Sequence, residues 1–590
     1  MECGHCESVN WQRVLMTVGI VMLCASRLFA VSPKIAMDLR GKATLDRVNV
    51  IVQFTKTPTA RHHQKVFSKG GTLNRKLGLV KAGAYSIPAS ALVRLAADPE
   101  VAYISPERPL FSTSNGSPTA VLDYHTETVN ASAAWDAGLN GTGIGVAVID
   151  SGIIDIPDLH GQNNLVVASQ NFASSASKGA TDQYGHGSHV AGIIAGTGKN
   201  SQGSKYFYTF RGISNNVQLI DLRVLDQNGA GTDSQVIAAI QTAIQLKSKY
   251  NIRVINLSLG RPVYESYTLD PLCQAVEQAW KAGIVVVVAA GNDGRNNNAG
   301  TNGYGTISAP GNDPYVITVG AMNTVGTPSR SDDQNASYSS KGPTLFDHIV
   351  KPDLVAPGNH IISLYTASLN LNRLYPGNEI PESLYKTNGK STASSTYYSL
   401  SGTSMAAPVV SGAAALLLQK NPTLTPDQVK ALLMQSAYKN LVPYSSVTNP
   451  VTGLTYCGQA DIFTVGAGYL DIQAALADIS LPTLSAKSPA AAYDPVSGNF
   501  FLVKDTSAIW GSNALWGSTE VWGNEFVSGQ SNLSGTNALW GSNALWGSNA
   551  LWGSSATAGF DALWGSNALW GSSTSGATNA LAVSLNGDDQ

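Results

Sequence analysis

The N-terminal part of the sequence lacks an apolar run long enough to cross a membrane as a helix. Its apolar run covers residues 14–26, between Arg13 and Arg27, whereas a membrane-spanning helix needs about 20 such residues. A short apolar run behind a basic residue is typical of a secretory signal peptide. We therefore predict a signal peptide over residues 1–30 and a secreted or extracellular protein. Cell-surface association and an uncleaved membrane anchor are the alternatives.

The sequence also has no large excess of positive or negative charge. The 37 Lys and Arg residues nearly balance the 39 Asp and Glu residues, which leaves a formal net charge of −2. Such a balance provides neither a basic field for binding nucleic acid nor an acidic tail. We therefore expect no nucleic-acid partner.

Cysteine is scarce, with five residues at positions 3, 6, 24, 273 and 457. The first three lie in or before the apolar run, so only Cys273 and Cys457 would remain after signal-peptide removal. These two could form one disulfide in an oxidising compartment, or they could stay as two free buried thiols. In either case the fold cannot depend heavily on disulfides.

A chain of 590 residues is too long for one ordinary domain. Residues 46–110 read as a compact unit of strand, helix, strand, helix and strand, with strand-like runs at 48–54, 84–87 and 101–104. The small, turn-forming residues STSNGSPT follow at 112–119. We predict a linker with a processing site over residues 111–129.

Residues 130–480 alternate apolar strand-like runs with amphipathic helical segments. The clearest runs cover residues 145–149, 254–257, 284–290 and 316–319. A helix is predicted to begin at Asp233, because Thr232 suits an N-cap and apolar residues follow at helical spacing. This alternation predicts an α/β domain with a parallel sheet that has helices on both faces.

Residues 481–590 form a low-complexity tail in which the hexapeptide NALWGS recurs. Every gap between the Trp-Gly pairs is a multiple of six residues, so the tryptophans of an extended chain would share one face. The composition favours disorder or a poorly ordered β-like coil. A small solenoid and a surface-binding or polymer-binding module remain open, and the partner is unknown.

An acidic residue ends the first predicted core strand. The segment GTGIGVAVIDSGI at 141–153 carries Asp150 directly after the apolar run. Burying a carboxylate at that place is unfavourable because it loses its hydration, unless a positively charged or hydrogen-bonding partner compensates. The carboxyl ends of parallel strands line the ligand crevice of such sheets. Asp150 is therefore a candidate functional residue, although aspartates at strand ends are common.

Two histidines, His186 and His189, follow in the segment YGHGSHVAG. The glycines beside His186 leave its ring open to a substrate and to partner side chains. The His-x-x-His spacing could also belong to a metal site. The sequence has no HExxH signature and no further clustered ligands, which argues against zinc.

The third element is the segment SGTSMAAP at 401–408, which leads into a helix of small residues. The turn places Ser404 at a helix N-terminus, where exposed N–H groups and the helix dipole favour developing negative charge. Ser404 could instead be a simple N-cap.

Taken together, VIDSG, GHGSHVAG and GTSMAAP in this order resemble the subtilisin-like serine proteases. The resemblance covers residues 130–480 and implies a catalytic triad of Asp150, His186 and Ser404. One departure is Ser188 where the family usually has threonine, which keeps a hydroxyl. The implied fold is a subtilisin-like α/β parallel sheet, preceded by a small α+β (ferredoxin-like) propeptide at 46–110 and followed by the Trp-Gly repeat tail.

The resemblance also implies the groups around the reacting bond. Asn292, in VVVVAAGN, matches the oxyanion asparagine, which would stabilise a tetrahedral intermediate together with the Ser404 N–H. The segment Ser258-Leu259-Gly260 matches the strand that pairs with the substrate backbone. The segment Ala289-Ala290-Gly291 would form the opposite wall. Such small walls leave room for a large apolar side chain before the scissile bond.

The implied activity is endopeptidase hydrolysis of proteins through an acyl-enzyme, with the propeptide as intramolecular inhibitor. No metal or organic cofactor is required for the chemistry, while structural calcium is possible at ligands that the sequence does not identify. The alternative function is that of a catalytically weak subtilisin-fold protein that binds or adheres through its Trp-rich tail. The presence of all three triad residues and Asn292 argues against that alternative.

Overall fold

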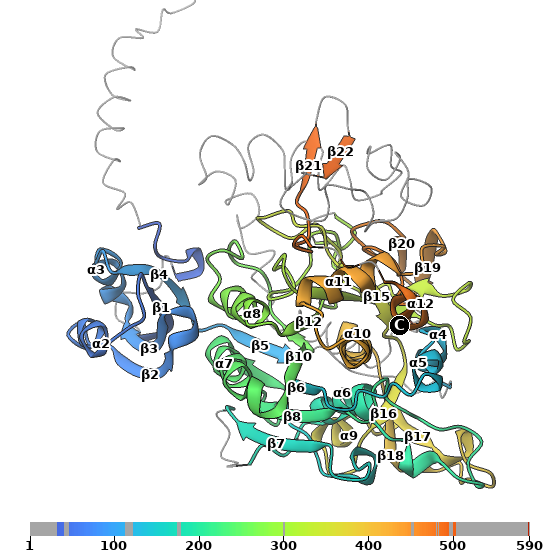
Figure 1. Cartoon of the computed structure of the whole chain (residues 1–590). Coiled ribbons are helices and arrows are strands. Elements are labelled where there is room, and N and C mark those ends of the chain that lie inside the picture. The colour runs from blue at the N-terminus through green and yellow to red at the C-terminus, as the bar shows by residue number, and fades with distance from the viewer. Residues whose placement is uncertain are drawn as a thin grey trace, which may run out of the picture.

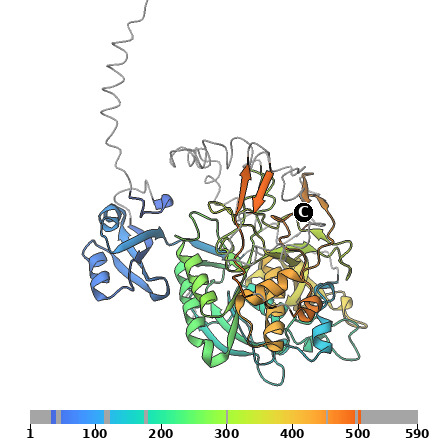
Figure 2. The same ribbon diagram turned by 45° about the horizontal axis from the view of Figure 1, so that its top comes forward.

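The computed structural model describes residues 32–39, 47–112, 122–173, 179–298, 301–449, 453–479, 481, 483–494, 499–502 and 588. The predicted signal peptide at 1–30 lies outside these residues, and so does most of the predicted tail at 481–590, including every Trp-Gly pair. Two folded parts stand beside each other, a small N-terminal domain and a large α/β domain (Figures 1 and 2).

The small domain is a four-stranded antiparallel sheet in the order β2-β3-β1-β4, with two helices. Its elements are β1 (Arg47–Phe54), α2 (Ala60–Phe67), β2 (Thr72–Leu77), β3 (Ala82–Pro88), α3 (Leu92–Ala96) and β4 (Val101–Pro106). Five of these six elements were predicted. The sequence analysis missed β2, an edge strand whose side chains are mostly exposed or half-buried, so its apolar signal is weak.

The two faces of this small sheet have different neighbours. One face, with Val50, Val52 and Tyr85, packs in a core that belongs to the small domain. The other face, with Ile51 and Ala84, belongs to the continuous core of the large domain. The small domain therefore buries its second apolar face only against its neighbour.

The large domain is built on an eight-stranded sheet in the order β14-β13-β12-β10-β6-β8-β7, with β15 paired to β13. All neighbouring pairs are parallel except β13 with the short strand β14. The strands are β6 (Gly145–Asp150), β7 (Val166–Asn171), β8 (Gln218–Arg223), β10 (Ile252–Leu257), β12 (Val285–Ala289), β13 (Ile317–Asn323), β14 (Gln334–Asn335) and β15 (Leu354–Pro357). The predicted α/β class is confirmed, and the four predicted runs lie in β6, β10, β12 and β13.

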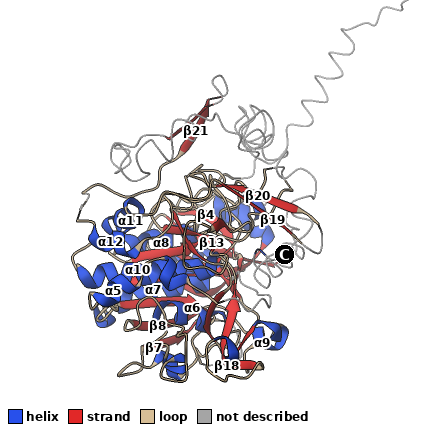
Figure 3. Cartoon of the chain, turned by 90° about the vertical axis from the view of Figure 1, so that its right-hand side faces the viewer, coloured by secondary structure: helices blue, strands red, loops and turns tan. Residues whose placement is uncertain are grey.

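Helices cover both faces of this sheet (Figures 1 and 3). Helix α7 packs with α8 on one face, and α6 packs with α10 on the other. The main helices are α6 (His186–Ala195), α7 (Asp233–Tyr250), α8 (Pro271–Lys281), α10 (Thr403–Lys420), α11 (Pro426–Gln435) and α12 (Ile472–Ala477). Helix α7 begins at Asp233 as predicted, with Thr232 as N-cap and Gln235 closing a capping box.

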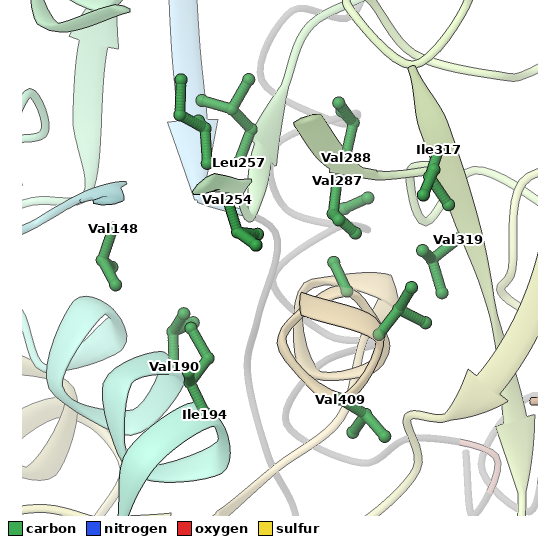
Figure 4. Close-up of a cluster of buried hydrophobic side chains, with 14 of the residues drawn as sticks. Val148, Val190, Ile194, Val254, Leu257, Val287, Val288, Ile317, Val319 and Val409 are labelled. Carbon is green, nitrogen blue, oxygen red and sulfur yellow. The ribbon is translucent and has the colours of Figure 1, made fainter. Parts of the chain in front are cut away.

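The core between α6, α10 and the sheet consists mainly of branched aliphatic side chains (Figure 4). Val148 and Val254 project from the sheet, Val190 and Ile194 from α6, and Val409 from α10, and all five are buried. Burying a side chain of this size stabilises the fold by about 1.5–3 kcal/mol. This packing fixes α6 and α10 against the sheet, and each helix carries a predicted site residue in its first turn, His186 in α6 and Ser404 in α10.

Shorter elements complete the large domain. They are α4 (His125–Thr128), α5 (Ser132–Asp136), β16 (Ile361–Leu364), α9 (Asn370–Leu374), β17 (Glu379–Pro381), β18 (Ala393–Leu400), β19 (Tyr444–Thr448), β20 (Thr455–Gln459), β21 (Ala491–Asp494) and β22 (Asn499–Leu502). Helix α4 lies inside the predicted 111–129 linker, whose residues 113–121 are outside the described ones. Among the described residues no helix is long and apolar enough to cross a membrane.

The chain after the predicted boundary at 480 continues to contact the α/β core. The Lys430 ammonium, fully buried, donates to the carbonyls of residues 314–316, at 3.0, 3.2 and 2.9 Å. It also donates to Ser488 Oγ at 2.8 Å and lies 3.0 Å from Asp353 Oδ1. Ser488 itself donates to Asp353 at 2.6 Å. The oxygen cage around Lys430 thus ties the segment at 488 to α11 and β15.

Candidate active site

Asp150 and His186 form a buried pair at the carboxyl end of β6. Asp150 is the last residue of β6 and His186 is the first of α6. Their side chains are 1% and 0% exposed, and Asp150 Oδ1 lies 2.7 Å from His186 Nδ1. An ionised carboxylate can only accept a hydrogen bond, so this contact favours the proton on Nδ1, and a neutral ring then has its lone pair on Nε2. The contact therefore favours the tautomer that a general base needs.

Asp182 joins the Asp150 loop to the first turn of α6. Its carboxylate accepts hydrogen bonds from the N–H groups of Tyr184, Gly185 and Ser188, at 2.9, 2.8 and 3.0 Å. The Ser188 hydroxyl donates to it at 2.7 Å and the Ser151 hydroxyl at 2.9 Å. Burial raises the pKa of Asp182, and the hydrogen bonds from Ser188 lower it. Asp182 is thus a positioning residue for His186.

Two glycines and two hydroxyls let the Asp150 loop and α6 approach closely. A Cβ on Gly187 would lie 2.3 Å from the Gly152 carbonyl oxygen, a distance that only glycine tolerates. The Ser151 hydroxyl accepts a hydrogen bond from the Gly187 N–H at 2.9 Å, and Ser188 Oγ accepts one from the Ile154 N–H at 3.1 Å. The serine at position 188 therefore performs its bonding role without the methyl group of threonine.

His189 does not belong to this site. Its Nε2 atom lies 3.1 Å from the Ile361 carbonyl oxygen and 3.0 Å from the Tyr398 carbonyl oxygen. Burial lowers the pKa of His189 to about 3, so the ring is neutral and serves as a buried structural donor. Within the described ranges no three His, Cys, Asp or Glu side chains come together as a possible metal site. A carboxylate cluster for the calcium that the resemblance allows is therefore missing from that part of the chain.

Ser404 lies in the first turn of α10, which begins at Thr403. Its hydroxyl donates to the Ser258 carbonyl at 3.0 Å, and the Ser258 hydroxyl donates to the Ser404 carbonyl at 2.8 Å. The N-cap Gly402 has a φ of +147°, in the region that favours glycine. His186 Nε2 is buried and has no hydrogen-bond partner among the described residues.

Asn292 is oriented by the residue before Ser404. Its carbonyl oxygen Oδ1 accepts from the Thr403 N–H and from the Thr403 hydroxyl, both at 3.0 Å. Thr403 Oγ1 accepts in turn from the Gly291 N–H at 3.1 Å. Because Oδ1 is held by these two donors, the amide nitrogen of Asn292 must point the other way. Thr403 thereby fixes which end of the Asn292 side chain can serve as a donor.

The two predicted walls of the specificity pocket meet at a third segment around Ser308. Ser308 N–H donates to the Ala290 carbonyl at 2.9 Å, and Ala309 exchanges two backbone hydrogen bonds with Arg261. A Cβ on Gly260 would lie 3.0 Å from Ser308 Cβ, and one on Gly291 would lie 2.4 Å from Ser308 Oγ. The structure therefore brings 258–260 and 289–291 together with 308–309 between them.

The strand β11 (Leu259–Gly260) is already paired in this structure. The segment β5 (Pro109–Ser112), which leaves the small domain, lies between β11 and β9 (Ala230–Thr232) in a three-stranded antiparallel sheet. Leu259 pairs with Ser112 and Gly260 with Phe111, and Leu110 pairs with Gly231. Leu110 is fully buried, whereas Phe111 is 45% exposed. The predicted substrate-binding strand thus holds part of the same chain.

Sequence reasoning missed Asp182, Thr403 and Ser308, whose roles depend on contacts between segments far apart in the chain. Asp182 had no local signal, because the N-cap position of a helix that begins at His186 is Gly185. The suggestion of a disulfide is also wrong. Cys273 and Cys457 are both free, and Cys457 is exposed rather than buried. Burial raises the pKa of Cys273 far above its usual range, so that side chain is a neutral thiol.

Comparisons with known proteins agree with this geometry. The profile of the subtilase family matches residues 141–463. Serine protease AprX of Bacillus subtilis (strain 168) is 38% identical over 327 residues, which cover 54% of this chain and 67% of that protein. Subtilisin J of Geobacillus stearothermophilus is 32% identical over 445 residues, covering 75% of this chain and 93% of that protein.

A solved structure resembles the fold. It is fervidolysin from Fervidobacterium pennivorans, described as a keratinolytic enzyme related to subtilisin. The two structures align with a TM-score of 0.54 and a sequence identity of 22%. The alignment covers 79% of this chain and 67% of the fervidolysin chain. At this identity the likeness concerns the fold alone.

Proposed function

This chain belongs to the subtilase family and is a subtilisin-like serine endopeptidase, and from that premise we propose that Asp150, His186 and Ser404 carry out its chemistry. The observation that supports this assignment most directly is the buried 2.7 Å contact between Asp150 and His186. It leaves Nε2 as the proton acceptor, and Ser404 lies in the first turn of the neighbouring helix α10, which packs against α6.

The proposed reaction is acyl transfer in two steps. The Ser404 hydroxyl first gives up its hydrogen bond to the Ser258 carbonyl. Its oxygen then transfers the proton to His186 Nε2 and attacks the carbonyl carbon of the peptide. His186 then donates this proton to the leaving amine, while Asp150 stabilises the imidazolium. Water enters and repeats the cycle on the acyl-enzyme, which regenerates Ser404.

Asn292 and the backbone N–H of Ser404 would bind the oxyanion of the tetrahedral intermediate. The two hydrogen bonds from Thr403 to Asn292 Oδ1 support this role, because they fix the amide nitrogen as the donating end of the side chain. A donor fixed before the reaction stabilises new charge better than water that must reorient.

A serine-directed fluorophosphonate provides the first test of this assignment. We expect the matured protein to form a covalent adduct on Ser404, located by peptide mass spectrometry. The alternative function, adhesion by a catalytically weak protein through its Trp-rich tail, predicts no adduct. An adduct on a different serine would also contradict the assignment.

We also propose that the protein is secreted and made as a zymogen, with residues 46–110 as an inhibitory propeptide. The signal-like run at 14–26 supports secretion. The position of β5 between β9 and β11 supports inhibition, because a bound strand from the same chain excludes substrate from that place. Structural calcium stays a prediction.

The pairing of β5 suggests where the chain is cut. Ser112 is paired with Leu259, and in an antiparallel register the next position of a bound strand belongs opposite Ser258. The Ser258 carbonyl accepts the Ser404 hydroxyl. We therefore propose cleavage between Thr113 and Ser114, inside the linker at 111–129.

The expected N-terminus of the matured protein is Ser114, which N-terminal sequencing would show. Leu110→Asp should slow maturation by about tenfold or more, because it puts a charge in a fully buried position. Phe111→Asp is the matched control, since that side chain is 45% exposed. Equal maturation of the two variants, or a different N-terminus, would contradict the proposed register.

A further inference from the structure

Residues 108–111, which lead into and form β5, have side chains that alternate between buried and exposed. Arg108 and Leu110 are buried, whereas Pro109 and Phe111 are exposed. This is the period of two of an extended strand. Two successive inward positions therefore meet the large domain, one occupied by Leu110 and the other, two residues earlier, by Arg108.

The Arg108 guanidinium binds Glu265 of the large domain in a bidentate fork. Nη1 donates to Oε1 at 2.6 Å and Nη2 to Oε2 at 2.7 Å, and the two side chains are 3% and 5% exposed. The guanidinium carbon also lies 4.8 Å from the centre of the Tyr264 ring. A fork of two hydrogen bonds above an aromatic ring suits arginine better than lysine.

The backbone at this position is held as well. The Arg108 carbonyl accepts from the Asp233 N–H at 3.1 Å, and Pro109 and Leu110 pair with β9. These contacts are made by the main chain, so a different sequence in the same extended conformation could make them. The side-chain contacts depend on residue type: the two hydrogen bonds to Glu265, and two more that Arg108 donates to Asp38, at 3.0 and 3.1 Å.

Release of the small domain would leave Glu265 without its partners. Its other close donor, the Tyr103 hydroxyl at 3.1 Å, also belongs to the small domain. The nearby Arg261 is already bound to Asp233 at 2.8 Å and to Asp270 at 2.8 Å. Burial raises the pKa of Glu265 and the hydrogen bonds from Arg108 lower it. Release also removes the side chains that cover Glu265, and the carboxylate can then accept the same two hydrogen bonds from a guanidinium of a ligand.

We propose that Glu265, with the Tyr264 ring, forms a subsite that selects an arginine six residues before the scissile bond of protein substrates. This proposal rests on the proposed function, since the count of six follows from cleavage after Thr113. In the precursor Arg108 occupies the subsite, and in the mature enzyme a substrate side chain replaces it. Part of the selectivity thus comes from a charge, in addition to the apolar pockets nearer the cut.

The test compares quenched fluorescent peptides based on residues 106–117, PERPLFSTSNGS, with Arg, Lys, Gln or Glu at the position of Arg108. For the matured wild-type protein we expect kcat/KM for the Arg peptide to exceed that for the Gln peptide by about tenfold. Most of the difference should be in KM, and the preference should decrease at high salt. The Lys peptide should fall between the two and the Glu peptide below both.

The matched variants are Glu265→Gln and Glu382→Gln. Glu265→Gln should bring the ratio of kcat/KM for the Arg and Gln peptides close to 1. Glu382→Gln should leave this ratio at the wild-type value, because Glu382 pairs with Lys386 on the surface. If Glu265→Gln fails to mature, the double variant Arg108→Gln/Glu265→Gln restores a neutral pair in the precursor. The wild-type peptide series decides the question independently of any variant.

The outcomes separate the two proposals. Equal hydrolysis of the Arg and Gln peptides by the wild type would overturn the Glu265 subsite and leave the endopeptidase assignment intact. Cleavage at a bond other than Thr-Ser would overturn the register and with it the count of six. Hydrolysis of none of the peptides by a protein that matures and takes the fluorophosphonate on Ser404 would also overturn the subsite. Without that label, the proposed function itself fails.

Discussion

Ser404→Ala is expected to reduce peptide hydrolysis by at least about 10⁴-fold, to a level set by substrate binding and the oxyanion donors alone. The hydroxyl is the only part of the side chain that forms the acyl-enzyme, and alanine keeps the helix start intact. Because the protein is proposed to process itself, the same variant should accumulate as a precursor that still carries residues 46–110. Immunoblotting and mass measurement of the secreted protein would show both effects.

The control for this variant is Ser204→Ala, since Ser204 is an exposed serine of the same domain. It should mature and hydrolyse peptides like the wild type. If Ser404→Ala matures as fast as the wild type, another protease removes the small domain, and the self-processing proposal is wrong. Residual hydrolysis at more than a few per cent of the wild-type rate would instead argue against Ser404 as nucleophile.

Asn292→Leu is expected to lower kcat by about 100- to 1000-fold, equivalent to about 3–4 kcal/mol of transition-state stabilisation. Leucine has nearly the shape of asparagine but cannot donate a hydrogen bond to an oxyanion. KM should change little, because the charge develops only in the transition state. Steady-state kinetics on one peptide, with active sites counted by fluorophosphonate labelling, would measure this split.

Variants of Thr403 test whether this residue acts by orienting Asn292. Thr403→Val removes the hydroxyl that donates to Asn292 Oδ1 and accepts from the Gly291 N–H, and it should lower kcat by about tenfold. Thr403→Ser keeps the hydroxyl and should restore most of the activity. An effect of Thr403→Val on top of Asn292→Leu as large as its effect alone would show that Thr403 does not act through Asn292.

The sequence was most informative where one residue type is required by chemistry or by packing. Asp150 ends β6 and Ser404 lies at the N-terminus of α10 as expected, because an acid after an apolar run and a serine after a glycine turn are local signals. The four apolar runs became core strands for the same reason. The pair Asp150–His186 followed from the family resemblance, and the structure brings the two side chains together.

What the sequence did not reveal depends on partners that are distant in the chain. Thr403 acts on Asn292 across 111 positions, and β5 finds its neighbours in β9 and β11. The small-residue composition around Ser112 predicted a linker, since a strand that pairs through its main chain needs no apolar signature. The edge strand β2 was not predicted for a similar reason, because most of its side chains are exposed or half-buried.

The oxygen cage around Lys430 makes this part of the fold independent of dissolved metal ions. Five oxygen atoms surround one ammonium group there, an arrangement that proteins often give to a bound metal ion. A cation that is part of a side chain cannot be dialysed away, stripped by a chelator or exchanged for another ion. At the joint between α11, β15 and the segment at 488, the positive charge therefore stays in place whatever salts surround the molecule.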